Sequence, residues 1–280
     1  MPTPSFRLLV IVFWMGMMGW LFERELLPRL VLGPPPGFHD AVADLADDQE
    51  TSTPVRWTVS GGTPFGSNEQ TGTATTCVER RPDGSVLLSG DVQLNRLPML
   101  GLLEPADQPL ALSASTRFYL DSTGCLRHFD IEASVQGIDA PLVVRGRVEG
   151  KKLHVTVAIN GSLHEETLAY DPRGLVMNSF SPVGRMPNLR VGQAWNIPVV
   201  NPLTGRVDLV RAKVTGRELI PWGNHPALAA LVVTQTTGIA GTVARTWVSS
   251  DGLVLRQEVP LLLSTMTFER VPDDLERRAR

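Results

Sequence analysis

The sequence holds few of the residues from which catalytic and metal sites are usually built. Among 280 residues there are two cysteines and five histidines, with no CxxC pair and no Cys/His spacing typical of a zinc site. A Gly-rich phosphate loop, a dinucleotide-binding fingerprint and a G-x-S-x-G nucleophile motif are also missing. We therefore predict that the protein is not an enzyme and that it carries no cofactor and no bound metal.

A surplus of positive charge is missing as well. The chain has 26 lysines and arginines against 29 aspartates and glutamates, which gives a net charge of −3. Domains that bind nucleic acid carry a basic surplus on one face or along one helix. The composition therefore predicts no nucleic-acid partner.

Long apolar runs are absent except at the N-terminus, where Leu8–Phe22 carries no charge. Arg7 and Arg24 can extend their charged heads to the lipid interface, which brings the run to the lower limit for a membrane span. The run is not followed by the small residues that a signal-peptide cleavage site needs. We predict that residues 1–24 form an uncleaved signal anchor, a single transmembrane helix in the inner membrane. A cleaved signal peptide and a buried core helix are the alternatives.

The composition changes after this run. Residues 25–54 are acidic and rich in proline, and Pro34-Pro35-Pro36 interrupts any helix. We interpret this segment as a tether to a domain at residues 55–271, and residues 272–280 as a charged tail. A short N-terminal tail usually stays in the cytoplasm, so we expect the C-terminal domain in the periplasm, although the positive-inside bias is weak.

From Val55 onward, apolar and polar residues alternate along most of the chain. Half-buried antiparallel strands need this alternation, and Asp/Gly turns separate the alternating stretches. The predicted fold is mainly β: a large curved antiparallel sheet or half-barrel, built as a meander. Strands are expected at 85–94, 110–121, 127–136, 142–148, 153–159, 225–237, 242–249, 253–259 and 263–271.

The sequence also suggests two similar halves, at about 55–160 and 190–271. Phe118–Arg127 and Thr246–Arg256 share an aromatic strand end, an Asp/Gly turn and an apolar–Arg strand start. Each half opens with a tryptophan-bearing strand. The alternative is that β-hairpins resemble one another without a shared origin.

Two irregular segments, 97–108 and 175–192, interrupt the alternation and contain apolar, adaptable side chains. Methionine suits surfaces that repack around varied apolar ligands, so these side chains are candidates for a ligand site on the concave face. The alternative is that they plug the ends of the sheet. The candidate ligand-binding residues are Met99, Leu100, Leu102, Leu103, Met177, Phe180 and Met186.

The two cysteines leave two interpretations open. Cys77 and Cys125 are an even count in a compartment that is expected to be oxidising, which allows one disulfide. Two separate thiols are the alternative.

The histidines and paired carboxylates fall at polar positions of the predicted strands. His128 and His154, like Asp130 and Glu132, are therefore expected on the solvent face. A metal site of His154 and His164 across a hairpin is conceivable, but nothing in the spacing is diagnostic of one.

The segments RVGQAWNIPVVNPLTG and WVSSDGLVLRQEVP, with Trp195, Trp247, Asp251, Gly252 and Arg256, resemble β-domains of the bacterial envelope. Among these are the β-regions found ahead of transglutaminase-like domains, although the transglutaminase Cys-His-Asp module is absent here. The overall pattern also looks like the outer-membrane lipoprotein carriers, whose curved sheet holds acyl chains on its concave face.

This resemblance implies a membrane-tethered, non-catalytic binding module outside the cytoplasm that holds a lipid or acyl chain on a concave apolar face. The alternative is a structural or assembly protein whose sheet docks another envelope protein.

Overall fold

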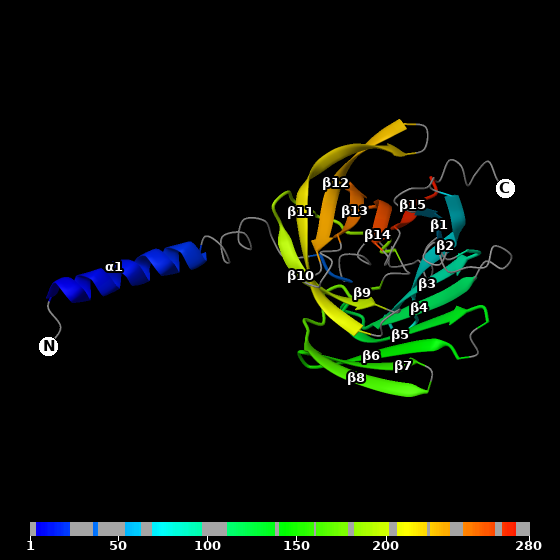
Figure 1. Ribbon diagram of the computed structural model, residues 1–280, viewed down its shortest axis with the longest axis horizontal. Helices are drawn as coiled ribbons and strands as arrows, with labels where there is room; N and C mark the ends of the chain where they lie inside the picture. The colour runs from blue at the N-terminus through cyan, green and yellow to red at the C-terminus, as the bar shows by residue number, and fades with distance from the viewer. Residues whose placement is uncertain are drawn as a thin grey trace.

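The architecture is that of a single large sheet preceded by one helix (Figure 1). A mainly β fold is thus confirmed. The computed structural model describes residues 4–22, 36–38, 54–62, 69–96, 111–137, 140–159, 161–178, 182–201, 206–222, 225–235, 243–260 and 265–272.

The N-terminal helix α1 (Pro4–Leu21) projects away from the sheet in Figure 1. Every side chain from Val10 to Phe22 is exposed, and this stretch covers more than three turns, so none of its faces is buried against the domain. The predicted helix is confirmed. By length and hydropathy, no helix in the described part of the chain qualifies as a membrane span.

The first half of the sheet is a meander of eight antiparallel strands, each paired with the next along the chain. These strands are β1 (Val55–Gly62), β2 (Glu69–Arg80), β3 (Val86–Leu94), β4 (Leu112–Leu120), β5 (Leu126–Val135), β6 (Leu142–Glu149), β7 (Lys152–Ile159) and β8 (Ser162–Ala169).

The second half is a similar meander, to which the short strand β9 adds in parallel through β10. Its strands are β9 (Met177–Asn178), β10 (Ala194–Asn201), β11 (Arg206–Trp222), β12 (His225–Gln235), β13 (Val243–Ser249), β14 (Val254–Pro260) and β15 (Thr265–Arg270).

The first and last strands join the two meanders. β1 pairs antiparallel with β15, with Val59 opposite Phe268, and neither side chain is exposed to solvent. The result is one sheet of 15 strands in the order β8 to β1, then β15 to β9. In the described part of the chain this sheet is unclosed, with β8 and β9 as its end strands.

The two end strands nevertheless lie near one another, because a short segment joins them. Only Tyr170–Val176 separates β8 from β9, and a chain of this length spans at most about 28 Å. Tyr170, Leu175 and Val176 are buried, and burial raises the pKa of the Tyr170 hydroxyl. Figure 1 shows the sheet curving round, and this short, partly buried segment connects its two end strands.

The inner face of the sheet is filled by its own side chains. Along β4, for example, Leu112, Ala114, Phe118 and Leu120 are buried, whereas the residues between them, apart from Thr116, are not. Aromatic rings pack in sequence through this interior: the ring centroids of Phe38 and Phe118 lie 5.4 Å apart. One continuous hydrophobic core results, as the alternating pattern predicts.

Phe38 belongs to the segment that the sequence interprets as a tether. Its amide N–H donates to the Arg173 carbonyl at 3.2 Å, and Gly37 forms an isolated bridge with Gly174. Residues 36–38 are therefore part of the folded domain.

The turns proposed to mark an internal repeat occupy equivalent places. Each joins the third and fourth strands after the tryptophan-bearing strand of its half, β1 with Trp57 and β10 with Trp195. Gly124 and Gly252 take positive φ angles of 75° and 84° in these turns, and a register shift precedes each turn, on β4 and β13. The hairpins thus match in geometry as well as in sequence, while shared origin stays a prediction.

The ring of Phe129 packs closely against a glycine in the interior. It lies against Gly146 on β6, where an added Cβ would come within 2.0 Å of the ring. We expect Phe129→Ala to lower the free energy of unfolding by about 3–5 kcal/mol, because it leaves a large cavity in a buried site. Urea-induced unfolding followed by circular dichroism would measure this loss.

Leu163→Ala is the matched control, because that side chain is 62% exposed on β8 and its loss should cost less than about 0.5 kcal/mol. Equal losses in the two variants would contradict the described packing.

Candidate functional site

Most of the predicted ligand-binding residues lie outside the described residues. This holds for Met99, Leu100, Leu102, Leu103 and Phe180, while for Met177 the structure gives the strand β9 but not the side chain. Met186 is described and is 1% exposed within the main core. It helps to fill the interior, as the alternative interpretation of these residues expects.

The cysteines do not form a disulfide in the structure. Cys77 lies on β2 and Cys125 in the turn between β4 and β5, so β3 and β4 separate them. At a strand spacing of about 4.8 Å, this exceeds the roughly 7 Å between Cα atoms that a disulfide can bridge. The interpretation as two separate thiols agrees with this arrangement.

His154 and His164 do not converge on a metal site. The register places His154 opposite Thr167 and His164 opposite Val157, so the two imidazoles lie on opposite faces of the sheet. Among the described residues, no group of three or more metal-ligating side chains is assembled.

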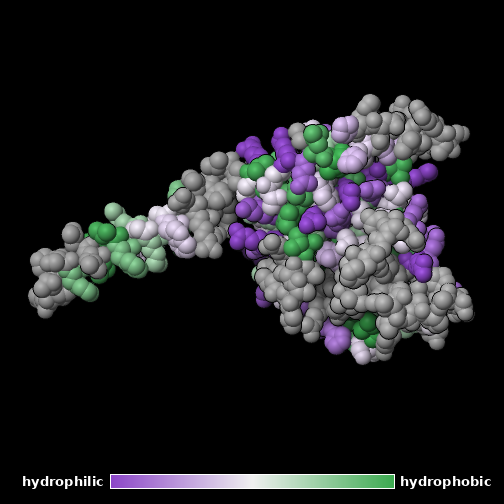
Figure 2. All heavy atoms as spheres, turned by 45° about the horizontal axis from the view of Figure 1, so that its top comes forward, coloured by the Kyte–Doolittle hydropathy of each residue, from purple (hydrophilic) through white to green (hydrophobic). Residues whose placement is uncertain are grey.

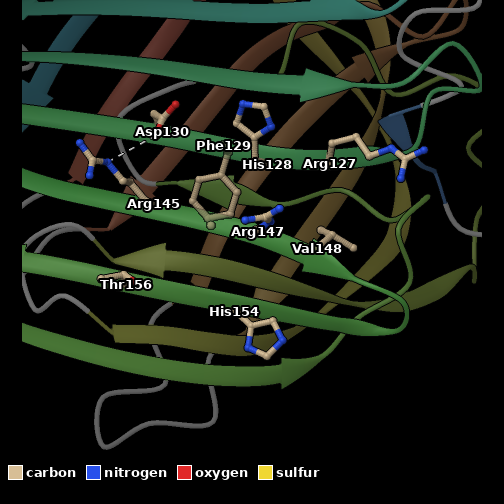
Figure 3. A pocket seen from close by; sticks show the side chains of 10 residues that line it. Arg127, His128, Phe129, Asp130, Arg145, Arg147, Val148, His154 and Thr156 are labelled. Atoms are coloured by element: carbon tan, nitrogen blue, oxygen red, sulfur yellow. Dashed lines mark ion pairs between the residues drawn. The ribbon is translucent and has the colours of Figure 1, made fainter.

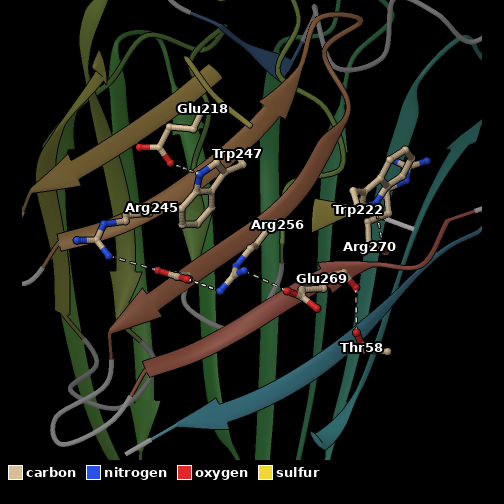
Figure 4. A network of polar contacts seen from close by, with 9 residues as sticks. Thr58, Glu218, Trp222, Arg245, Trp247, Arg256, Glu269 and Arg270 are labelled. Carbon is tan, nitrogen blue, oxygen red and sulfur yellow. Dashed lines mark hydrogen bonds and ion pairs between the residues drawn. The ribbon is translucent and has the colours of Figure 1, made fainter. Parts of the chain in front are cut away.

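A polar network on the outer face links β11 with β13, β14 and β15 (Figure 4). The Trp247 indole N–H donates to Glu218 at 3.0 Å, and the Arg256 guanidinium lies 5.3 Å from the Trp247 ring. Arg256 also pairs with Glu258 at 2.7 Å and with Glu269 at 3.3 Å. This network covers a small second cluster of buried residues around Trp247 and ties strands together, so it is structural.

The outer face of β5, β6 and β7 carries a groove of about 670 Å³ (Figure 3). Its lining contributes three guanidinium groups and two imidazoles but a single carboxylate. The lining residues are Arg127, His128, Phe129, Asp130, Arg145, Gly146, Arg147, Val148, His154 and Thr156.

Strand register brings the groove's cationic side chains together. His128, Arg147 and His154 are register neighbours on β5, β6 and β7, and Figure 3 shows them one above another across the three strands. Asp130, Arg145 and Thr156 form the neighbouring row. The Tyr119 ring stacks on the His128 ring with centroids 4.1 Å apart and extends the first row to β4.

The ion pairs of the groove are long or lie at its rim. Arg145 is 3.8 Å from Asp130 and Arg147 is 3.6 Å from Glu149, both longer than the usual 2.7–2.9 Å of a charge-assisted hydrogen bond. Arg127 makes a shorter contact of 3.0 Å with Asp121. Such exposed pairs contribute about 0–1 kcal/mol each, so they hold the arginines only loosely.

The sequence placed His128, Asp130 and His154 correctly on the solvent face, but did not bring them together with Arg145 and Arg147. The grouping depends on which residues of three strands lie opposite one another. Counting residues outward from each hairpin turn in β5–β7 gives the residues that lie opposite one another, and this could have predicted the grouping.

Strand β8 forms the free edge beside this groove. In the part of the chain that the structure describes, β8 pairs only with β7, and its side chains from Ser162 to Thr167 are all exposed. The sequence did not predict this strand, because it lacks apolar alternation. Asn160-Gly161 before it is a typical hairpin signal that could have indicated it.

No protein-family profile matches the chain, and no curated protein matches it. Among solved structures, a β-barrel-like protein of the domain of unknown function DUF1849 from Brucella abortus is similar, with a TM-score of 0.49 and 9% identity over 78% of this chain and 95% of that chain. A DUF1089 family protein from Pseudomonas aeruginosa has a TM-score of 0.39 and 13% identity over 72% and 95%. Neither match carries a function over to this chain, and the resemblance to lipoprotein carriers stays a prediction.

Asp121 fixes the turn at the rim of the groove. Burial alone would raise the pKa of its carboxyl group, but hydrogen bonds from the Thr123 hydroxyl and from the Cys125 and Thr123 amides, with the charge of Arg127, outweigh this effect. The net pKa therefore lies below its ordinary value. The stability from this ionised carboxylate is fully present above the unfolded-state pKa of about 3.9 and is lost as the pH falls through the folded-state pKa.

We expect Asp121→Ala to lower the free energy of unfolding by about 1 kcal/mol at neutral pH, because the turn loses these hydrogen bonds. The difference from the wild type should shrink as the pH drops below about 4. Urea-induced unfolding at several pH values measures this difference in the free energy of unfolding. Asp91→Ala, on the exposed outer face of β3, is the control. A difference that stays constant down to pH values well below 4 would contradict this role.

Proposed function

We propose that this protein is a non-catalytic binding module of the bacterial envelope that docks another envelope protein through the edge of its sheet. The observation that carries the proposal is strand β8, an eight-residue edge with mostly exposed side chains whose one hydrogen-bonded neighbour among the described strands is β7. Such an edge presents backbone N–H and C=O groups to which an extended segment of another protein can add as a further strand.

The charges of β8 indicate the chemistry of the partner strand. Glu165 and Glu166 lie at the centre of the strand and point to opposite faces of the sheet, as register partners of Thr156 and Val155. A second copy pairing antiparallel about this centre would bring like carboxylates opposite one another, which is unfavourable. The edge therefore favours an extended segment with lysine or arginine at successive positions.

The filled interior favours docking over the lipid-carrier interpretation. An acyl chain needs open apolar space, whereas Trp57, Phe129 and Phe268 are each at most 1% exposed within one continuous core. The groove on β5–β7 is lined mainly by charged and polar side chains and lies on the outside of the sheet.

We further propose that the N-terminal helix holds the module at a membrane, with the β domain in the periplasm. Apolar side chains cover the helix without packing on the domain: Phe13 is 66% exposed and Trp14 58%. Figure 2 shows the helix protruding from the body with neutral to apolar residues along it. Exposed apolar surface of this extent is typical of segments that contact lipid or another protein.

The docking proposal predicts binding of a basic β-forming peptide at β8. We expect an extended valine- and threonine-rich peptide with two successive lysines at its centre to slow the amide hydrogen exchange of residues 162–169, and the same peptide with two successive glutamates to have no effect. Glu165→Lys combined with Glu166→Lys should reverse this preference, because like charges repel across strands.

Glu79→Lys combined with Glu132→Lys is the matched control, since it changes the net charge equally at exposed positions away from the edge. Protection outside β8, or equal effects of both peptides, would overturn the proposal.

The proposed location predicts the result of protease protection. A C-terminal tag on the full chain should be digested in intact spheroplasts, and the membrane fraction should retain the protein. Replacing Ile11 and Phe13 by aspartate should release it to the soluble fraction, because a buried charge in lipid is unfavourable. A tag that resists protease until the cells are lysed would contradict the periplasmic location.

A further inference from the structure

We propose that the groove on the outer face of β5, β6 and β7 binds the phosphate group of a ligand, with Arg147 as its central residue. Arg147 stands between His128 and His154, one on each neighbouring strand. Adjacent strands lie about 4.8 Å apart, so the three side chains can reach one small anion together. This site is independent of the docking edge, because it uses the outer face of the sheet and not its free backbone groups.

The charges within the groove favour an anion over a cation. Asp130 is the one carboxylate in the lining, and Arg145 already lies beside it. Glu149, the partner of both Arg147 and His154, is outside the lining, and its contacts of 3.6 and 3.9 Å are long. An oxyanion in the groove would therefore gain hydrogen bonds from Arg147 at the loss of one weak contact.

The geometry of the donors favours phosphate among the anions. A guanidinium presents a planar fork that binds two oxygens of a phosphate, and donors from two other strands can bind its remaining oxygens. The His154 ring is held at one side of the groove, because its Nδ1 lies 3.0 Å from the Thr167 hydroxyl. Its Nε2 lies 3.9 Å from a Glu149 oxygen, beyond hydrogen-bond distance, so this nitrogen can donate to an anion instead. The Thr156 hydroxyl lies in the same groove.

The size of the groove and its aromatic side allow a group attached to the phosphate. A volume of about 670 Å³ exceeds what a single phosphate fills. The stacked pair of Tyr119 and His128 continues the row beyond Arg147, with the Arg81 guanidinium 5.3 Å from the Tyr119 ring. A phosphate ester or a diphosphate fits this row better than an isolated ion.

Isothermal titration calorimetry of the full-length protein with sodium pyrophosphate and with glycerol 3-phosphate tests the proposal. We expect at least one of them to bind, and Arg147→Gln to weaken that binding by about tenfold or more. Raising the salt concentration from about 50 to about 200 mM should also weaken it. Tighter binding of pyrophosphate would indicate a soluble ligand, and tighter binding of glycerol 3-phosphate a lipid headgroup.

Arg245→Gln is the matched control, because Arg245 is also exposed on the outer face and makes a 3.6 Å contact with a glutamate, Glu258. The Arg245→Gln variant should bind the two probes as the wild type does. Arg147 is 78% exposed, so its replacement should leave the fold intact, which circular dichroism verifies. Failure of both probes to bind, or equal weakening by Arg147→Gln and Arg245→Gln, would overturn the proposal.

Discussion

The pairing of β1 with β15 is the constraint on which the rest of the structure depends. Each meander alone would be an open sheet with a wide apolar face, and this one pairing joins them into a single sheet whose apolar faces turn toward one another. Val59, Met266 and Phe268 are fully buried at this junction. Because the two strands come from the ends of the domain, the junction forms only when the whole chain from β1 to β15 is present.

The interior and the outer face of the joined sheet differ in what fills them. Its interior is occupied by aromatic and aliphatic side chains and by loop residues such as Phe38 and Met186. The outer face is different in its two halves. Around Trp247, hydrogen bonds and short ion pairs link the polar side chains, whereas on β5–β7 Arg145 and Arg147 make long, exposed ion pairs. The free edge β8 adjoins that second region, so both proposed binding surfaces lie at one end of the sheet order.

Much of this fold could be predicted from the sequence, because burial of one face imposes a period of two on each strand. In the strand predicted at 127–136, Phe129, Ile131 and Ala133 alternate with polar residues and are buried, while His128 and Asp130 lie on the solvent face as predicted. The alternation of apolar and polar residues does not predict β8, because both faces of this strand are exposed. Its pairing with β7 is what makes it a strand. The cationic groove was missed for another reason. It combines residues from three strands, and their register is decided by the turns between those strands, which alternation does not reveal.

Hydrogen exchange of the free full-length protein tests the central claim most directly, because it reports how strongly each strand is held in the sheet. A single sheet joined through β1 and β15, with β8 as its open edge, predicts that amides of β1 and β15 exchange among the slowest and those of β8 markedly faster. Exchange of β1 and β15 as fast as that of β8 would mean that the two meanders are not joined, and would contradict this account.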